Sequence, residues 1–183
     1  MEEEDLIRKL LARDESAYRY CIDKHKDHVF KVCTGFLHNR EDAEDVCQEV
    51  FMELFNSLTS FRGSASLSTW LYRIAVNRSL NLLKKKRRAL WYSKMLGGFA
   101  PAFSKSSPQD KLENKELSGI LVKAIEKLPE NQRIAYTLVT YDDLSYEEVS
   151  GVMNVSLSSV ESLLFRARNN LKKSLLHYYE KNY

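Results

Sequence analysis

The chain has 183 residues, a formal net charge of +3 at pH 7 and an apolar share of 44%. This length and composition are typical of one large or two small globular domains, and the scarcity of Gly and Pro favours helices. No apolar run approaches the roughly 20 residues that span a bilayer, and the start, MEEEDLIRKL, lacks the basic leader of a secretory signal. We therefore expect a cytoplasmic protein with no direct membrane insertion.

The N-terminal segment predicts two helices, which break near ARDES and TGFL. Asn39 is then placed to cap a third helix whose first turn holds Glu41 and Asp42, as the helix dipole favours. Its apolar positions form one stripe that we expect to be buried: Ala43, Val46, Cys47, Val50, Phe51, Leu54, Phe55 and Leu58. The opposite side is an acidic face, formed by Glu41, Glu44, Asp45, Gln48 and Glu49.

A fourth helix is expected to begin near Leu67, after the small-residue loop TSFRGSAS. Leu67, Trp70, Leu71, Ile74 and Ala75 form its core stripe, and Arg73, Asn77, Asn81, Lys84 and Arg88 follow another side. Cationic groups beside aromatic residues and a loop indicate binding of single-stranded nucleic acid, because unstacked bases need flat surfaces and pockets. Trp70 also fits a plain core position.

The charge distribution supports a polyanionic partner. No acidic residue lies between Glu53 and Asp110, and that stretch includes the basic run from Lys84 to Arg88. Each phosphate that Lys or Arg neutralises releases a condensed counterion. A solvated basic face or a disordered basic linker would give the same pattern without such a partner.

Residues 91–107 lose helical periodicity and gain Gly, Pro and Ser, which predicts a linker between a first domain at 1–90 and a second at 108–183. The fold class is thus all-α, with two small helical domains. We expect Ser107 and Pro108 to open the second domain as cap and first-turn residue. Its first helix should bury Leu117, Ile120, Leu121, Ala124, Ile125 and Leu128. A second helix, starting within LPENQR, carries Ile134, Ala135, Leu138 and Val139.

The stretch from Leu144 to Leu175 predicts a helix-turn-helix. Ser145 and Glu148 form a capping box, and Asn154 enters the left-handed region at low energetic cost, so the chain can turn there. Ser156 then caps a last helix with Val160, Leu164, Ala167, Leu171 and Leu175 facing inward. Such a helix can enter the major groove, with Ser158, Ser159, Glu161, Ser162, Phe165 and Arg166 toward the DNA. Helical hairpins also occur without any DNA role.

The sequence offers little for catalysis. No H-E-x-x-H motif or Gly-rich phosphate loop is present, and we expect His25, His28, His38 and His177 on the surface. The three cysteines are Cys21, Cys33 and Cys47, which form no C-x-x-C pair, so we expect buried free thiols. We predict no enzymatic activity, no metal and no cofactor.

Two long motifs resemble one family, the extracytoplasmic-function (ECF) sigma factors of the sigma-70 family, which are bacterial transcription initiation factors. EDAEDVCQEVFMELFNSLTSFRGSASLSTWLYRIAVNRSLNLLKKKRR looks like their region 2, and LPENQRIAYTLVTYDDLSYEEVSGVMNVSLSSVESLLFRARNNLKKSL is similar to their region 4. The resemblance covers nearly the whole chain, in the family's order, with a short linker in place of region 3. It implies three partners: core RNA polymerase, promoter DNA and an anti-sigma factor.

The resemblance also implies residue roles. Asp45, Gln48 and Glu49 match the helix that docks on the clamp helices of the polymerase's largest subunit. The residues that match the loop capturing a −10 base are Arg62, Ser64, Ala65 and Ser66. Those that match the helix reading the opened strand are Trp70, Tyr72, Arg73, Asn77 and Arg78, and Lys84 and Arg88 match positions that contact upstream phosphates. The residues expected to read the −35 element are Ser158, Ser159, Glu161, Ser162, Phe165 and Arg166. Glu161 and Leu163 stand where many members have Lys and Arg, so the resemblance does not predict which −35 sequence is recognised.

Two other readings fit parts of the chain. A helix-turn-helix regulator that binds an operator without polymerase explains the second domain alone. A helical adaptor that binds only proteins leaves the charge asymmetry unexplained.

Overall fold

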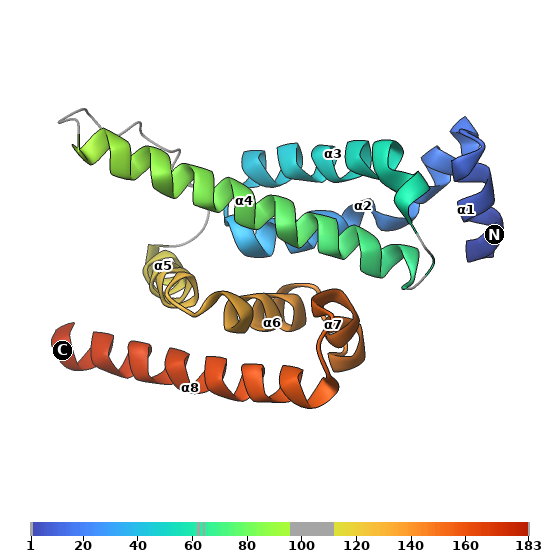
Figure 1. Cartoon of the computed structure of the whole chain (residues 1–183). Helices are drawn as coiled ribbons and strands as arrows, with labels where there is room; N and C mark the ends of the chain where they lie inside the picture. Colours follow the sequence, from blue (N-terminus) through green and yellow to red (C-terminus); the bar gives the residue numbers. More distant parts are fainter. Residues whose placement is uncertain (1, 62, 64, 96–111, 183) are drawn as a thin grey trace. The chain divides into compact units, whose positions relative to one another are not determined.

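The computed structural model describes residues 2–61, 63, 65–95 and 112–182, and these are helical throughout apart from turns and loops (Figure 1). The helices are α1 (Glu3–Leu11), α2 (Glu15–Leu37), α3 (Arg40–Ser57), α4 (Leu67–Met95), α5 (Leu112–Glu126), α6 (Glu130–Tyr141), α7 (Tyr146–Met153) and α8 (Leu157–Asn182). The chain forms two compact units, an N-terminal unit, Met1–Ser106, and a C-terminal unit, Ser107–Tyr183. The all-α prediction is confirmed. No helix among the described residues is long and apolar enough to cross a membrane.

In the N-terminal unit, α2, α3 and α4 pack against one another, and α1 packs on α2. Caps define their starts: the Asp14 carboxylate accepts from the backbone N–H groups of Ser16 and Ala17 before α2, and the Asn39 side-chain oxygen accepts from Asp42 N–H at 3.0 Å before α3. Both caps satisfy amides that a helix start leaves without partners. The predicted break near ARDES and the Asn39 cap are therefore confirmed.

The core of this unit contains most of the predicted stripe and departs from it at Phe55. Val50 and Leu54 are fully buried, whereas Phe55 is 50% exposed. The Phe55 ring stacks on Tyr18, with 3.6 Å between ring centroids, so it covers the edge of the core from outside. A wide apolar stripe on a helix of this length extends past the contact surface, which periodicity alone does not reveal.

Two further predictions about single residues are settled by burial. His25 is buried, which contradicts the expected surface position, because α2 contacts α1, α3 and α4 along its length. Burial lowers the pKa of His25, and the charges of Lys24 and His28 add to that effect. Cys21 and Cys33 are buried free thiols as expected, and burial raises their pKa values to about 11 and about 12. Cys47 is partly buried.

Helix α4 ends later than predicted. It continues to Met95, five residues past the boundary expected at residue 90, because no Gly or Pro interrupts LWYSKM before Gly97. Trp91, Tyr92 and Met95 are exposed on this extension, and the rings of Trp91 and Tyr92 make an edge contact at 5.1 Å. The first part of the expected linker is therefore helical.

The C-terminal unit is built on α8, which contacts α5, α6 and α7. Its core holds Ala124, Ile125 and Leu128 against Ala167 and Leu171 of α8. Leu121, predicted to be buried, is 37% exposed, since it lies just off the side of α5 that faces α8. The Ser107 and Pro108 cap lies outside the described residues, in which α5 begins at Leu112.

The predicted helix-turn-helix is present. The Ser145 hydroxyl accepts from Glu148 N–H and the Glu148 carboxylate accepts from Ser145 N–H, so both halves of the capping box form. Asn154 ends α7 in the left-handed region at φ 53°. The Ser156 hydroxyl accepts from Ser159 N–H at 3.3 Å, which starts α8. Each turn of this motif is thus fixed by a residue next to it in sequence.

Candidate nucleic-acid interface

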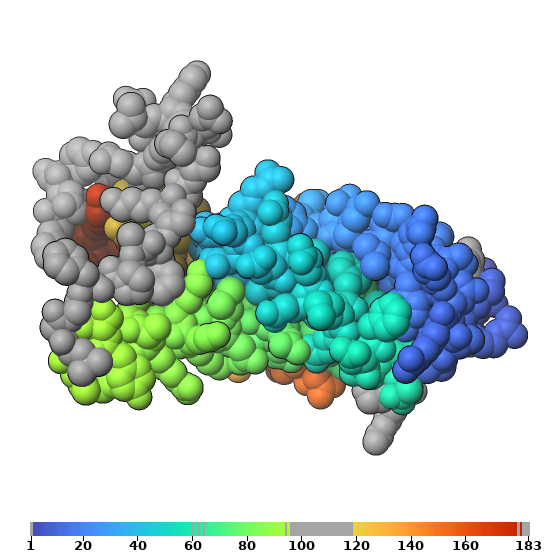
Figure 2. Space-filling model, turned by 90° about the horizontal axis from the view of Figure 1, so that it is seen from above, coloured from blue at the N-terminus to red at the C-terminus, as the bar shows by residue number. Residues whose placement is uncertain are grey.

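The acidic face of α3 is on the surface of the N-terminal unit. Asp45, Gln48 and Glu49 are all exposed, and Met52, one turn further along the same side, is 64% exposed. Figure 2 shows the cyan surface of α3 beside the green surface of α4. Met is enriched at protein–protein interfaces and their rims are polar, so this surface is a candidate for protein docking. Met52 is not predicted from the sequence as part of this face, because the face is defined there by its polar residues.

Ion pairs join this acidic face to α4. The Arg78 guanidinium of α4 contacts the carboxylates of Glu53 at 2.6 Å and Glu49 at 3.4 Å, and Lys86 of α4 pairs with Asp42 near the start of α3. Both pairs join α3 to α4, which run antiparallel. Arg78, predicted to contact DNA, is thus held by α3 in this structure. Glu49 likewise has an internal partner.

The loop between η1 (Leu58–Ser60) and α4 is closed by aromatic rings. Phe61 before the loop and Trp70 after it lie with ring centroids 5.2 Å apart. Gly63 has φ +67°, a conformation that side-chain-bearing residues adopt at an energetic cost. The Ser66 hydroxyl accepts from Thr69 N–H at 3.2 Å and caps α4. Ala65 and Ser66 lie at the end of this loop, and Arg62 and Ser64 lie outside the described residues.

The predicted strand-reading residues of α4 do not share one environment. Asn77, Lys84 and Arg88 are exposed, whereas Trp70 and Arg73 are partly buried. Tyr72 is only 7% exposed, so its ring is a core element rather than an open surface for a base. Most of the circumference of α4 is covered at this level, since Leu71, Ile74, Ala75 and Val76 are buried as well.

The residues predicted to contact duplex DNA lie on the first turns of α8. Ser158, Glu161, Ser162, Phe165 and Arg166 are exposed and Ser159 is partly so, while Val160, Leu164 and Ala167 are buried. Phe165 is 68% exposed, which makes it the most prominent apolar side chain of this surface. Arg166 Nε donates to the carbonyl of Ser162 at 3.2 Å, and Arg168 donates to the Tyr146 hydroxyl at 3.3 Å. Arg166 is therefore the cation on the exposed side of these turns, whereas Arg168 is hydrogen-bonded to α7.

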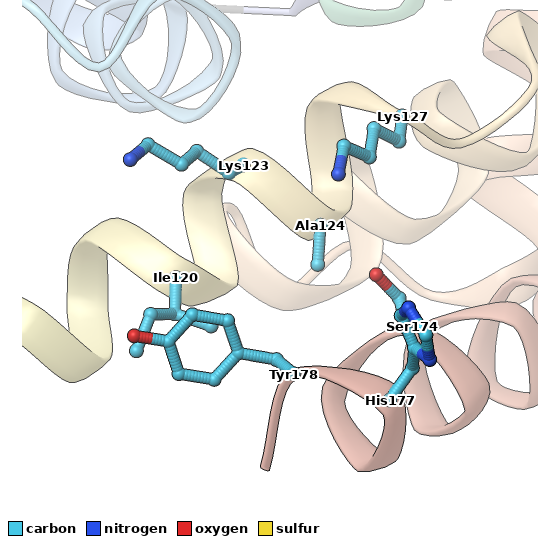
Figure 3. Close-up of a pocket in the computed structure, with 7 residues that line it drawn as sticks. All are labelled: Ile120, Lys123, Ala124, Lys127, Ser174, His177 and Tyr178. Carbon is cyan, nitrogen blue, oxygen red and sulfur yellow. The ribbon is translucent and has the colours of Figure 1, made fainter. Parts of the chain in front are cut away.

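A pocket of about 340 Å³ lies at the far end of α8, between this helix and α5 (Figure 3). It is lined by Ile120, Lys123, Ala124, Lys127, Ser174, His177 and Tyr178, and Figure 3 shows the Tyr178 ring beside Ile120. This lining contains cations and no carboxylate. Since Ser174 is more than four turns of helix from Ser158, at about 3.6 residues per turn, the pocket is separate from the exposed surface on the first turns of α8.

Comparisons with known proteins define the class first. The family model described as Sigma-70 region 2 matches residues 21–89, and that described as Sigma-70, region 4 matches residues 118–171. The first match includes α3, the loop and most of α4, and the second includes the helix-turn-helix. The two matches occur in the order of a sigma factor.

Relatives then define the group. The chain is 30% identical over 181 residues to the RNA polymerase sigma-H factor of Pseudomonas aeruginosa, which covers 95% of this chain and 94% of that one. It is 30% identical over 176 residues to SigW of Bacillus subtilis, with 92% and 94% covered, and 34% identical over 170 residues to the sigma-E factor of Escherichia coli, with 89% and 88% covered. The chain belongs to the ECF RNA polymerase sigma factors.

Solved structures agree on the fold. CnrH, solved with the cytosolic domain of CnrY, has a TM-score of 0.67 at 20% identity, covering 94% of this chain and 96% of that chain. RpoE of Bartonella quintana, solved with the anti-sigma factor NepR, has a TM-score of 0.61 at 22% identity, covering 86% and 96%. The family matches and the relatives above show the function of an alternative sigma factor in promoter-specific transcription initiation. The stand-alone regulator explains only the second match and is not favoured.

Proposed function

We propose that the N-terminal unit docks on core RNA polymerase and opens the −10 element, while the C-terminal unit reads the −35 element as duplex. The observation that carries this proposal is the placement of the acidic face and the aromatic-closed loop on adjacent helices of one unit. Asp45, Gln48 and Glu49, with Met52, form the docking surface on α3. Polymerase bound there has the loop and α4 beside it.

The −10 contact uses the loop and the exposed side of α4. Ala65 and Ser66, together with Arg62 and Ser64, form the pocket for a flipped base. Trp70 and Phe61 supply the aromatic wall, because their rings already face each other across the loop. Unpairing a base costs a few kcal/mol, which such a pocket offsets. Arg73, Asn77, Lys84 and Arg88 then follow the strand and the upstream phosphates.

Arg78 remains among the proposed strand contacts on one condition: it must exchange its carboxylate partners for a phosphate. Its side chain is 44% exposed and that of Glu53 is 33% exposed. An ion pair with this exposure contributes at most about 1 kcal/mol, so the exchange is energetically accessible. Tyr72 we remove from the strand contacts and assign to the core, since its ring is buried.

The −35 contact is made by the first turns of α8. Ser158, Ser159, Glu161, Ser162, Phe165 and Arg166 meet the major groove, where Arg166 suits guanine acceptors and Glu161 suits a cytosine amino group. Phe165 offers apolar contact to a thymine methyl group. Arg168, held to Tyr146, stays near the phosphates.

The two units work together only on the polymerase. Docking fixes the distance between them, so both promoter elements are engaged with a raised effective concentration. The chain itself performs no covalent chemistry and uses no cofactor. Its place of action is the cytoplasm, where polymerase and promoter DNA are found.

We further propose that an anti-sigma factor restrains this chain. The support is by similarity of fold, since RpoE of Bartonella quintana is solved with the anti-sigma factor NepR. Such a partner would compete with polymerase for the docking surface or with DNA for the loop.

The test is run-off transcription with bacterial core RNA polymerase, with and without the protein, on a pool of promoter fragments from its own genome. We expect initiation at a subset of fragments that share two spaced elements. Initiation at none of them, together with no binding to core enzyme, would overturn the docking assignment and leave the stand-alone regulator as the better account.

A further inference from the structure

The first residues of the chain touch the start of α4. The Glu3 carboxylate, in the first turn of α1, accepts a hydrogen bond from the backbone N–H of Leu67 at 3.0 Å. The two residues are separated by 64 positions in the sequence. Leu67 is the first residue of α4 and directly follows the loop that carries Ala65 and Ser66. A residue of α1 thus holds the exit of the proposed base-capture loop.

Helix α1 is firmly placed for this contact. Leu6 and Leu10 are almost fully buried, and α1 packs on α2. It also contacts η1, the turn that leads into the loop. Both ends of the loop are therefore held against α1, the entrance through η1 and the exit through Glu3.

The hydrogen bond adds to the cap of α4. The first N–H groups of a helix have no partner within it. The Ser66 hydroxyl takes the N–H of Thr69, and the Glu3 carboxylate takes that of Leu67. Its negative charge also interacts favourably with the positive end of the helix dipole. A residue outside the loop thus contributes to the start of α4, next to Ala65, Ser66 and Trp70.

We infer that Glu3 is a positioning residue for base capture at the −10 element. It contacts no DNA and acts through the Leu67 amide, by holding the loop in the conformation that receives the flipped base. This inference rests on the proposed function.

The test uses the full chain with three substitutions. Glu3→Ala removes the acceptor, Glu3→Gln keeps an oxygen at the same place without the charge, and Glu4→Ala is the control, since Glu4 is an exposed acid in the same turn. Amide hydrogen exchange of the free protein at Leu67 reports the hydrogen bond. Affinities of the polymerase-bound protein for a single strand carrying the −10 element, and of polymerase for the protein, report positioning.

We expect Glu3→Ala to speed exchange at Leu67 and weaken single-strand affinity, each about tenfold, as loss of a hydrogen bond to a charged group implies. Affinity for core polymerase should stay unchanged. Glu3→Gln should recover most of both losses, and Glu4→Ala should match the wild type. A purely stabilising role would speed exchange without changing single-strand affinity.

Three results would count against the inference. Unchanged exchange at Leu67 in Glu3→Ala would mean that the hydrogen bond does not form in solution. Unchanged single-strand affinity removes the positioning role, and increased affinity means that Glu3 competes with a phosphate. If the wild type neither binds core enzyme nor directs initiation, the proposed function fails and the positioning role falls with it, while the exchange measurement still decides the hydrogen bond.

Discussion

The helix-turn-helix of the C-terminal unit is held by near neighbours, whereas the loop of the N-terminal unit is held by residues far apart in sequence. In the first, Ser145 caps with Glu148 and Asn154 makes the turn. In the second, the Leu67 amide donates to Glu3, and Arg78 reaches Glu53 on another helix. The proposed duplex reading therefore depends on a locally encoded motif, whereas the proposed strand capture depends on the assembled domain.

The comparison is tested most strongly at the docking surface, which belongs to the N-terminal unit alone. Asp45→Arg should lower affinity for core polymerase by about 100-fold or more, because a like-charge contact at a docking face costs several kcal/mol. Binding of the variant to −35 duplex should not change. Fluorescence anisotropy with labelled protein measures both affinities.

The matched control for that variant is Asp23→Arg. The Asp23 side chain is 62% exposed but lies on α2, outside the acidic face of α3. It should bind polymerase nearly as the wild type does. Equal losses in both variants would mean that overall charge, not this surface, governs docking.

The recognition surface of the C-terminal unit is tested at Arg166. Arg166→Ala should weaken binding to −35 duplex by about 1–3 kcal/mol and relax preference at one base position, as loss of a base contact implies. Arg168→Ala is the control, since Arg168 is tied to Tyr146 and should affect all sequences alike. Titration of duplexes with single base changes distinguishes the two. Unchanged affinity would exclude Arg166 from the interface.

Local encoding of the helix-turn-helix is tested at its capping box. Ser145→Ala should lower the free energy of unfolding of the C-terminal unit by about 1 kcal/mol. Thermal unfolding followed by circular dichroism measures this change, with the exposed Ser158→Ala as control. Both tryptophans, Trp70 and Trp91, lie in the N-terminal unit, so the fluorescence transition should not move. An equal shift in fluorescence would show that the two units unfold together.

The smallest expected effect is a pH dependence confined to the N-terminal unit. Burial, followed by the charges of Lys24 and His28, holds the pKa of His25 below its ordinary value of 6.5, and the charge of Glu3 opposes this shift. Above pH 6.5 the residue is neutral in both folded and unfolded chains. Below it the unfolded chain binds the proton more readily, so stability decreases as pH falls.

Tryptophan fluorescence in denaturant, repeated from pH 7.5 to about pH 5, measures this effect, because the ordinary histidine pKa is about 6.5. His25→Gln should flatten the profile over that range, and the exposed His28→Gln should keep it. A profile that is the same in His25→Gln and the wild type would assign the acid sensitivity to other groups.

Much of the fold could be predicted because its signals are short-range. The Asn39 cap, the capping box at Ser145 and the left-handed Asn154 each depend on hydrogen bonds within a few residues. The acidic face was predictable for the same reason, since helical periodicity places Asp45, Gln48 and Glu49 together. Burial at the edges was not: Phe55 and Leu121 fit the apolar stripe yet are exposed, while His25 and Tyr72 are buried.

The sequence by itself determined the all-α class, the order of the two motifs, the helix-turn-helix and the side of α8 that faces solvent. The tertiary structure alone decided that Glu3 caps α4, that Phe61 meets Trp70 across the loop, and that Arg78 pairs with Glu53. The physical reason is range. Helix periods and caps depend on neighbours a few positions away, whereas these three contacts form only when the helices of the N-terminal unit pack together.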